Sequence, residues 1–130
     1  MITNYSQILD MPISNKTAGE IERIVEHIKH PVIFKPLPIN NPIGFGRADF
    51  TAYPEWIVYS IKDLPQKYFE ANLLHELYHL CQVVECFPTT KTKKHPNLNQ
   101  HDQSFLDGLG GFISSLILDL DVCDRIDSFG

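Results

Sequence analysis

The sequence has few of the residues that define several large classes of protein. It contains only three cysteines, Cys81, Cys86 and Cys123, and no Cys-x-x-Cys pair. An odd number of cysteines without that spacing indicates neither a disulfide framework nor a zinc site made of thiolates. We therefore expect reduced thiols and a cytoplasmic protein.

Long apolar runs and an excess of basic residues are also missing. No apolar run approaches the roughly 20 residues that a membrane-spanning helix needs. Residues 1–7 lack the basic region and apolar run of a signal peptide. The 11 Lys and Arg against 16 Asp and Glu give a net charge of −5, which disfavours a dedicated nucleic-acid binder because phosphate contacts need clustered basic residues. We expect no association with membranes and, at most, a local basic patch.

Helical and strand-like spacings of apolar residues cover most of the 130 residues, a length suited to a single domain over 1–130. We expect an irregular or briefly helical lead-in over 1–16, followed by a helix with a capping box at Thr17 and Glu20. Three strands are predicted over 32–34, 47–51 and 56–61. A helix over about 64–86 capped by Asp63, a basic loop over 87–98 and a long helix capped by Asn99 complete the chain. They predict an α+β fold, in which a short, mostly antiparallel sheet packs on the 64–86 helix and on the C-terminal helix.

The most informative motif is His-Glu-x-x-His, from His75 to His79, inside the helix predicted over 64–86. Residues four apart on a helix point off one face, so both imidazoles can reach one zinc ion at roughly 2.0–2.1 Å. Glu76 lies close enough to polarise a water molecule on the metal. The motif predicts a Zn²⁺ site with His75 and His79 as ligands and Glu76 as the general base.

A catalytic zinc site needs a third protein ligand. We favour His101, because it begins the second long helix four residues before Phe105, and we expect the apolar face with Phe105 to pack inward. Three glycines in that helix would allow the two helices to approach closely, or would break it locally. The alternatives are Asp107, with Asp102 beside it, His95 in the basic loop, and Glu85, which would point about 120° away from His79 around the helix.

The motifs together resemble the SprT-like (Spartan-type) zinc metallopeptidase domain and the related WLM group, over roughly residues 44–110. The matching motifs are Gly46-x-Ala48, Ile57-x-x-Ser60, Leu73-Leu74-His75-Glu76-x-x-His79 and His101-x-x-x-Phe105. The resemblance implies a small zincin-like core with His101 as the third zinc ligand, and it adds DNA as a partner. The neighbouring ImmA/IrrE-like peptidases and minimal gluzincins usually take an acidic third ligand, which would be Asp107 here.

The expected function is that of a zinc-dependent metallopeptidase acting on a protein or peptide. Glu76 would take a proton from water and pass it to the leaving amine. The strand over 56–61 could bind an extended peptide at its edge. Asn72 and Asp107 could hydrogen-bond a ligand imidazole, and they fit solvated positions equally well. The candidates for an electrophile that assists zinc are Tyr53, Tyr59, Tyr68 and His95.

Two other functions fit the same residues. One is a catalytically silent protein that binds zinc. The other is a nucleic-acid-associated module with a structural zinc site, which rests on the basic residues Lys91, Lys93 and Lys94 and on the family resemblance. These lysines fit a contact with an acidic substrate or nucleic acid, and they equally fit a solvated loop. The sequence does not predict an oligomeric state.

Overall fold

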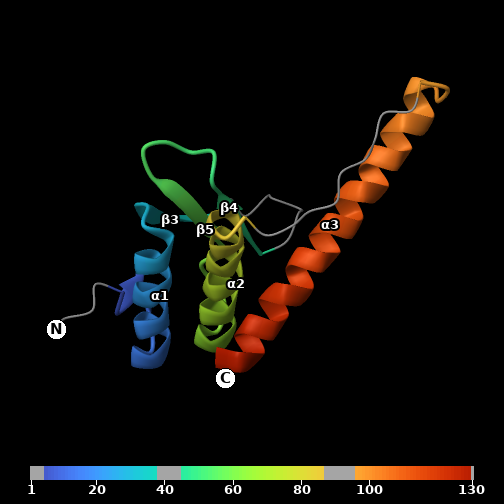
Figure 1. Cartoon of the computed structure of the whole chain (residues 1–130). Coiled ribbons are helices and arrows are strands. Elements are labelled where there is room, and N and C mark those ends of the chain that lie inside the picture. The colour runs from blue at the N-terminus through green and yellow to red at the C-terminus, as the bar shows by residue number, and fades with distance from the viewer. Residues whose placement is uncertain (1–4, 38–44, 87–95, 130) are drawn as a thin grey trace. The chain divides into compact units, whose positions relative to one another are not determined.

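The computed structural model describes residues 5–37, 45–86 and 96–129 (Figure 1). The elements in chain order are β1 (Gln7–Ile8), β2 (Met11–Pro12), α1 (Asn15–Ile28), β3 (Val32–Pro36), β4 (Gly46–Asp49), β5 (Trp56–Ser60), α2 (Gln66–Val84) and α3 (Gln100–Phe129). The chain divides into two compact units, Met1–Glu85 and Cys86–Gly130. The predicted α+β fold, with short and mostly antiparallel sheets, is confirmed. Among the described residues, no helix is both long and apolar enough to cross a membrane.

The first unit contains a three-stranded sheet in which β5 is the central strand, in the order β3-β5-β4. β3 runs parallel to β5, with Val32 opposite Trp56, and β4 runs antiparallel to it, with Gly46 opposite Ser60. Both edges of β5 are therefore paired within the sheet. The expectation that the strand over 56–61 binds a peptide at its edge is wrong, because β3 and β4 already occupy both of its edges.

Two helices lie side by side in this unit and supply most of its core (Figure 1). α1 buries Ile21, Ile24 and Ile28, each at most 5% exposed. α2 buries the predicted stripe, including Phe69, Leu73, Leu77 and Leu80, all 0% exposed, and contacts α1, β4 and β5. At about 25 cal/mol per Å² of apolar area removed from water, these side chains are the main reason that α2 has a fixed position in the unit.

The start of the chain differs from the expectation in two ways. The lead-in contains an antiparallel hairpin of β1 and β2, not an irregular or helical segment. Leu9 and Asp10 form its turn with φ angles of 52° and 64°, as a two-residue turn of this hand requires. α1 then begins earlier than predicted, because the Ser14 side chain, not Thr17, caps it by accepting from the Thr17 N–H.

The cap of α2 was also wrongly predicted. α2 begins one residue after Pro65, which occupies the N-cap position without a side-chain hydrogen bond, so Asp63 does not cap this helix. The helix spans Gln66–Val84 and is shorter at both ends than the predicted 64–86. The motif from His75 to His79 lies well inside it.

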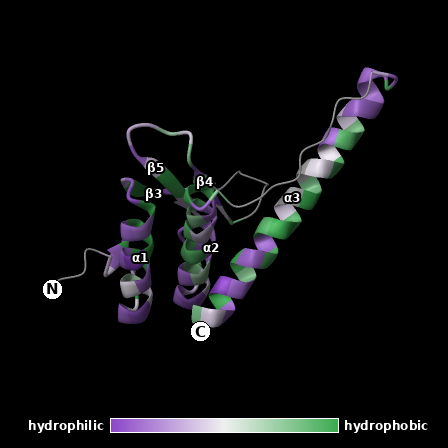
Figure 2. Cartoon of the chain, in the orientation of Figure 1, coloured by the Kyte–Doolittle hydropathy of each residue, from purple (hydrophilic) through white to green (hydrophobic). Residues whose placement is uncertain are grey.

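The second unit has α3 as its described element. Asn99 caps the helix as predicted, accepting from the Asp102 N–H at 2.8 Å. The backbone stays helical through Gly108, Gly110 and Gly111, so the glycines do not break it. Figure 2 shows hydrophobic positions alternating with hydrophilic ones along α3. Its apolar stripe includes the exposed side chains Phe105, Leu109, Phe112, Leu116 and Leu120. Inward packing of this stripe stays a prediction.

Candidate metal centre

The motif on α2 brings two imidazoles and a carboxylate together. His75 and His79 are half-buried, and Glu76 between them is 7% exposed. The Nε2 atoms of the two histidines are 3.2 Å apart, and their rings meet nearly edge to face at 80°. One ligand atom from each of the three residues lies within 4.8 Å of the others. The structure therefore places these three predicted residues in one cluster.

The separation of the two Nε2 atoms is close to what a metal requires. Two nitrogens that each lie about 2.0–2.1 Å from a tetrahedral zinc ion are roughly 3.3–3.4 Å apart. The observed 3.2 Å between His75 and His79 needs only a small adjustment to reach that value. The donor set fits zinc, which accepts imidazole nitrogen and carboxylate oxygen.

A glutamine that is not part of the predicted site contacts one of the histidines. The Nδ1 of His79 lies 2.9 Å from the Oε1 of Gln82, and Gln82 is 3% exposed. Residues three apart are neighbours on a helix surface. The i,i+3 spacing from His79 was the available signal for this contact.

Tyr78, inside the motif, joins α2 to α1. Its hydroxyl donates to the Oε2 of Glu20 at 2.6 Å, and Glu20 also accepts two hydrogen bonds from Arg23. Burial first, and then the Glu20 carboxylate, raise the pKa of Tyr78 well above its usual value. Tyr78 therefore remains a neutral donor at physiological pH.

Glu70 makes a second tie between the two helices. Its carboxylate accepts from the backbone N–H of Ser14 at 3.1 Å, from the Ser14 hydroxyl at 2.7 Å and from Gln66 at 2.8 Å. Burial alone would raise the pKa of Glu70, but hydrogen bonds from Thr17, Ser14 and Gln66 outweigh it, so the pKa lies below its usual value. A carboxylate near the start of α1 also suits the positive end of that helix.

Asn72 joins α2 to the sheet. Its Nδ2 donates to the Phe45 carbonyl at 2.9 Å and to the Ser60 hydroxyl at 2.7 Å. A Cβ on Gly46 would lie only 2.9 Å from that Nδ2 and from the Tyr59 carbonyl, so glycine is needed for this close approach. The amide nitrogen of Asn72 therefore bonds to the sheet, and a hydrogen bond from Asn72 to a ligand imidazole stays a prediction.

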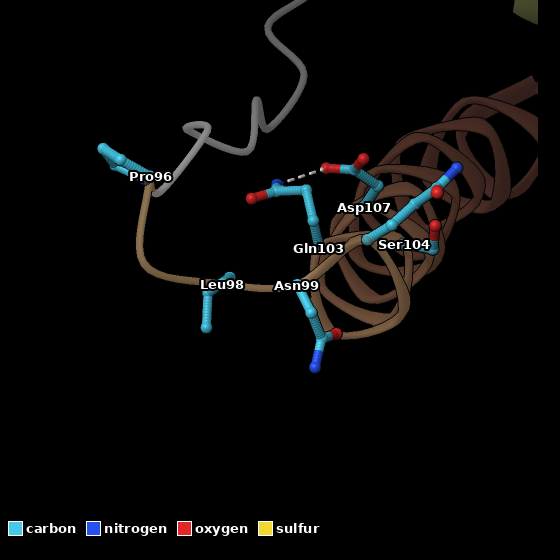
Figure 3. Close-up of a pocket in the computed structure, with 7 residues that line it drawn as sticks. Pro96, Leu98, Asn99, Gln103, Ser104 and Asp107 are labelled. Atoms are coloured by element: carbon cyan, nitrogen blue, oxygen red, sulfur yellow. Dashed lines mark hydrogen bonds between the residues drawn. The ribbon is translucent and has the colours of Figure 1, made fainter.

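The third ligand stays a prediction. His101 is exposed at the second position of α3, and Asp102 is exposed beside it. Asp107 accepts a hydrogen bond from Gln103 at 3.1 Å and lines a hollow at the start of α3 with Leu98 and Asn99 (Figure 3). These residues belong to the second unit of the chain.

Glu85 and His95 are the other candidates for the third ligand. Glu85 pairs with His27 of α1, with 3.0 Å between its Oε2 and the His27 Nε2, so its carboxylate is engaged by α1. His95 lies outside the described residues, as do Lys91, Lys93 and Lys94.

Three tyrosines are candidates for the electrophile that would assist zinc, and their positions relative to α2 differ. Ser60 of β5 faces α2, because its hydroxyl accepts from Asn72. Successive side chains of a strand point to opposite faces, so Tyr59 faces away from α2, with the Arg47 guanidinium 4.7 Å from its ring centre. Tyr53 and Tyr68 are 92% and 61% exposed. Tyr59 is therefore the least suitable of the three.

Comparison with known proteins identifies no relative. No protein-family model, curated protein or solved structure matches the chain.

Proposed function

We propose that the protein is a zinc-dependent metallopeptidase with its metal centre on α2. The observation that carries the proposal is the 3.2 Å separation of the His75 and His79 Nε2 atoms, with the Glu76 carboxylate beside them. Side-chain hydrogen bonds of Asn72, Tyr78 and Glu70 hold α2 against the sheet and α1. Such fixed positions favour a site that acts on a substrate, because misplacement of catalytic groups by about 1 Å can cost about 100-fold in rate.

Each group in the cluster has a distinct role. His75 and His79 would hold the metal, and His101 is the third ligand expected from the sequence, with Asp107 as the alternative. Zinc in such a site supplies a Lewis acid and lowers the pKa of water towards 7. Glu76 would accept the proton of the attacking water and deliver it to the leaving amine. Its low exposure, 7%, limits competition from bulk water.

We place the peptide substrate along β4. β4 lies at the edge of the sheet, and its outer side is not paired with any strand in the described part of the chain. Main-chain groups at a sheet edge can pair with an extended peptide. Asn72 lies one helical turn before His75 and bonds to Phe45, the residue before β4, which connects this edge to the metal helix. We further propose a reducing, cytoplasmic location, because an odd number of cysteines without a Cys-x-x-Cys pair indicates reduced thiols.

Zinc content and hydrolysis of an unstructured, fluorescently labelled protein test the proposal together. The parent should bind one zinc per chain and cleave the labelled protein. Glu76→Gln should keep the zinc and lose cleavage by more than about 100-fold, as expected for a general base. A parent that binds zinc without hydrolysing any peptide bond would instead support the catalytically silent zinc protein.

The third ligand is tested by two matched variants on α3, His101→Ala and Asp107→Ala. His101→Ala should lower the zinc affinity strongly, while Asp107→Ala should leave it unchanged. Full zinc affinity in His101→Ala, with a loss in Asp107→Ala, would transfer the role to Asp107.

A further inference from the structure

Gln82 has an arrangement that a solvated or purely packing glutamine does not need. It lies on α2 one turn after His79 and is 3% exposed. Its carbonyl oxygen, Oε1, lies 2.9 Å from the Nδ1 of His79. A carbonyl oxygen only accepts hydrogen bonds, so the Nδ1 of His79 must carry the proton and donate it.

This hydrogen bond determines which ring nitrogen of His79 is available to a metal. A neutral imidazole carries one proton, so protonation of Nδ1 leaves Nε2 with its lone pair. That Nε2 is the nitrogen 3.2 Å from the Nε2 of His75. The same bond limits rotation of the ring, since Nδ1 is held toward Gln82.

We propose that Gln82 is the positioning residue of the metal centre, which selects the tautomer and orientation of His79. The inference rests on the proposed zinc site, and it adds a residue that neither the motif nor the family resemblance assigns. Groups that accept the second N–H of a ligand imidazole commonly change metal affinity by 10–100-fold when they are removed. Gln82 supplies such an acceptor without adding a negative charge to the site.

The proposal also predicts the state of the metal-free pair. With the proton of His79 on Nδ1, the close Nε2–Nε2 contact requires His75 to donate from its Nε2, because two facing lone pairs would repel. Nitrogen-15 imidazole spectra of the metal-free parent should therefore show a proton on Nδ1 of His79 and on Nε2 of His75. A proton on Nε2 of His79 would contradict the proposed role of Gln82 without any metal being added.

Two substitutions at Gln82 separate hydrogen bonding from packing. Gln82→Met keeps the length of the side chain and removes the carbonyl acceptor, so the Zn²⁺ affinity in a chelator competition should fall by roughly 10–100-fold. Gln82→Glu keeps an acceptor at the same distance and should retain at least the parent affinity. With Co²⁺ as the probe, Gln82→Met should change the visible absorption spectrum and Gln82→Glu should resemble the parent.

Gln66→Met is the matched control. Gln66 lies in the first turn of α2 and donates to Glu70 at 2.8 Å, so this variant also removes a side-chain hydrogen bond from α2, away from His79. Its Zn²⁺ affinity should equal that of the parent. If Gln82→Met does not fold, Gln82→Glu and the spectra of the parent still decide the question.

The outcomes distinguish this inference from the proposed function. If the parent binds zinc at His75 and His79, and a folded Gln82→Met variant binds Zn²⁺ with the parent's affinity, the role of Gln82 is overturned while the proposed function stands. A parent that binds no zinc would overturn both.

Discussion

The two long helices of this protein differ in how their side chains are used. Side-chain hydrogen bonds join α2 to the sheet through Asn72, and to α1 through Tyr78 with Glu20 and Glu70 with Ser14. The side-chain hydrogen bonds described for α3 join residues of the same helix, such as Gln103 to Asp107. The difference indicates that hydrogen bonds within the first unit hold α2, and with it the predicted ligands His75 and His79, in position.

The largest expected change in the free energy of unfolding comes from truncating a buried leucine of α2, compared with an exposed leucine of α3. Leu77→Ala should lower the free energy of unfolding by about 2–5 kcal/mol, because Leu77 is 0% exposed and its loss leaves a cavity. Leu109→Ala, at a side chain that is 46% exposed, should cost less than Leu77→Ala. Urea denaturation measures both. Equal losses would show that α3 is as tightly packed as α2.

A smaller effect is expected from the tie between α2 and the start of α1. Glu70→Gln should lower the free energy of unfolding by about 1.5–3 kcal/mol at neutral pH, because hydrogen bonds to the charged carboxylate are lost. Gln66→Met, which removes one donor to the same carboxylate, is the control and should cost less.

The hydrogen bonds of Glu70 also predict how the free energy of unfolding depends on pH. The pKa of Glu70 is lowered in the folded protein, so its contribution to stability is present above the unfolded pKa, near the usual value of 4.5 for a glutamate, and is lost as pH falls through the folded pKa. Urea denaturation curves of the parent and of Glu70→Gln should therefore converge as the solution becomes acidic. A difference that stays constant down to acidic pH would contradict the assigned hydrogen bonds.

Asn72→Ala tests the connection between α2 and the edge strand. Loss of its two hydrogen bonds should lower the free energy of unfolding by about 0.5–1.5 kcal/mol. If the peptide binds along β4, cleavage should decrease while the zinc content stays at the parent level. A variant with parent cleavage rates would remove β4 as the substrate site.

The smallest effect is expected where the C-terminal ends of α1 and α2 are joined by an ion pair. His27→Ala removes the ion pair with Glu85, whose partners are 46% and 33% exposed. Solvent screens such pairs, so the cost should be about 0.2–1 kcal/mol. Zinc affinity should not change, because Glu85 is not expected to be a ligand. A loss of zinc in this variant would reopen that role for Glu85.

Local patterns predicted the elements better than they predicted the contacts between them. The spacing from Phe69 to Leu80 predicted the buried stripe of α2, and the His75–His79 spacing predicted a shared face, because both depend only on helical geometry. The start of α1 was predicted three residues too late. Ser14 caps α1 while its hydroxyl donates to Glu70, a residue 56 positions away, so this contact is not visible in the sequence near Ser14.

The strand order and the residues around the site could not be read from local patterns. The strand over 56–61 has the composition of any buried strand, and only its pairing with β3 and β4 shows that its edges are occupied. Asn72 was one possible partner of the imidazoles, because it is polar and near His75 in sequence. Its amide nitrogen bonds to Phe45 and Ser60, which lie 27 and 12 residues away and could not be identified as partners from local sequence.

Zinc stoichiometry tests the central claim most directly. The parent and His79→Ala, purified without added chelator and loaded with Zn²⁺, should be compared by elemental analysis and by chelator competition. The proposed centre predicts one tightly held zinc per parent chain and none in His79→Ala, with the α-helical circular dichroism of the variant unchanged. A parent without bound zinc, or a His79→Ala variant that binds zinc with the parent affinity, would contradict the assignment of the metal centre to α2.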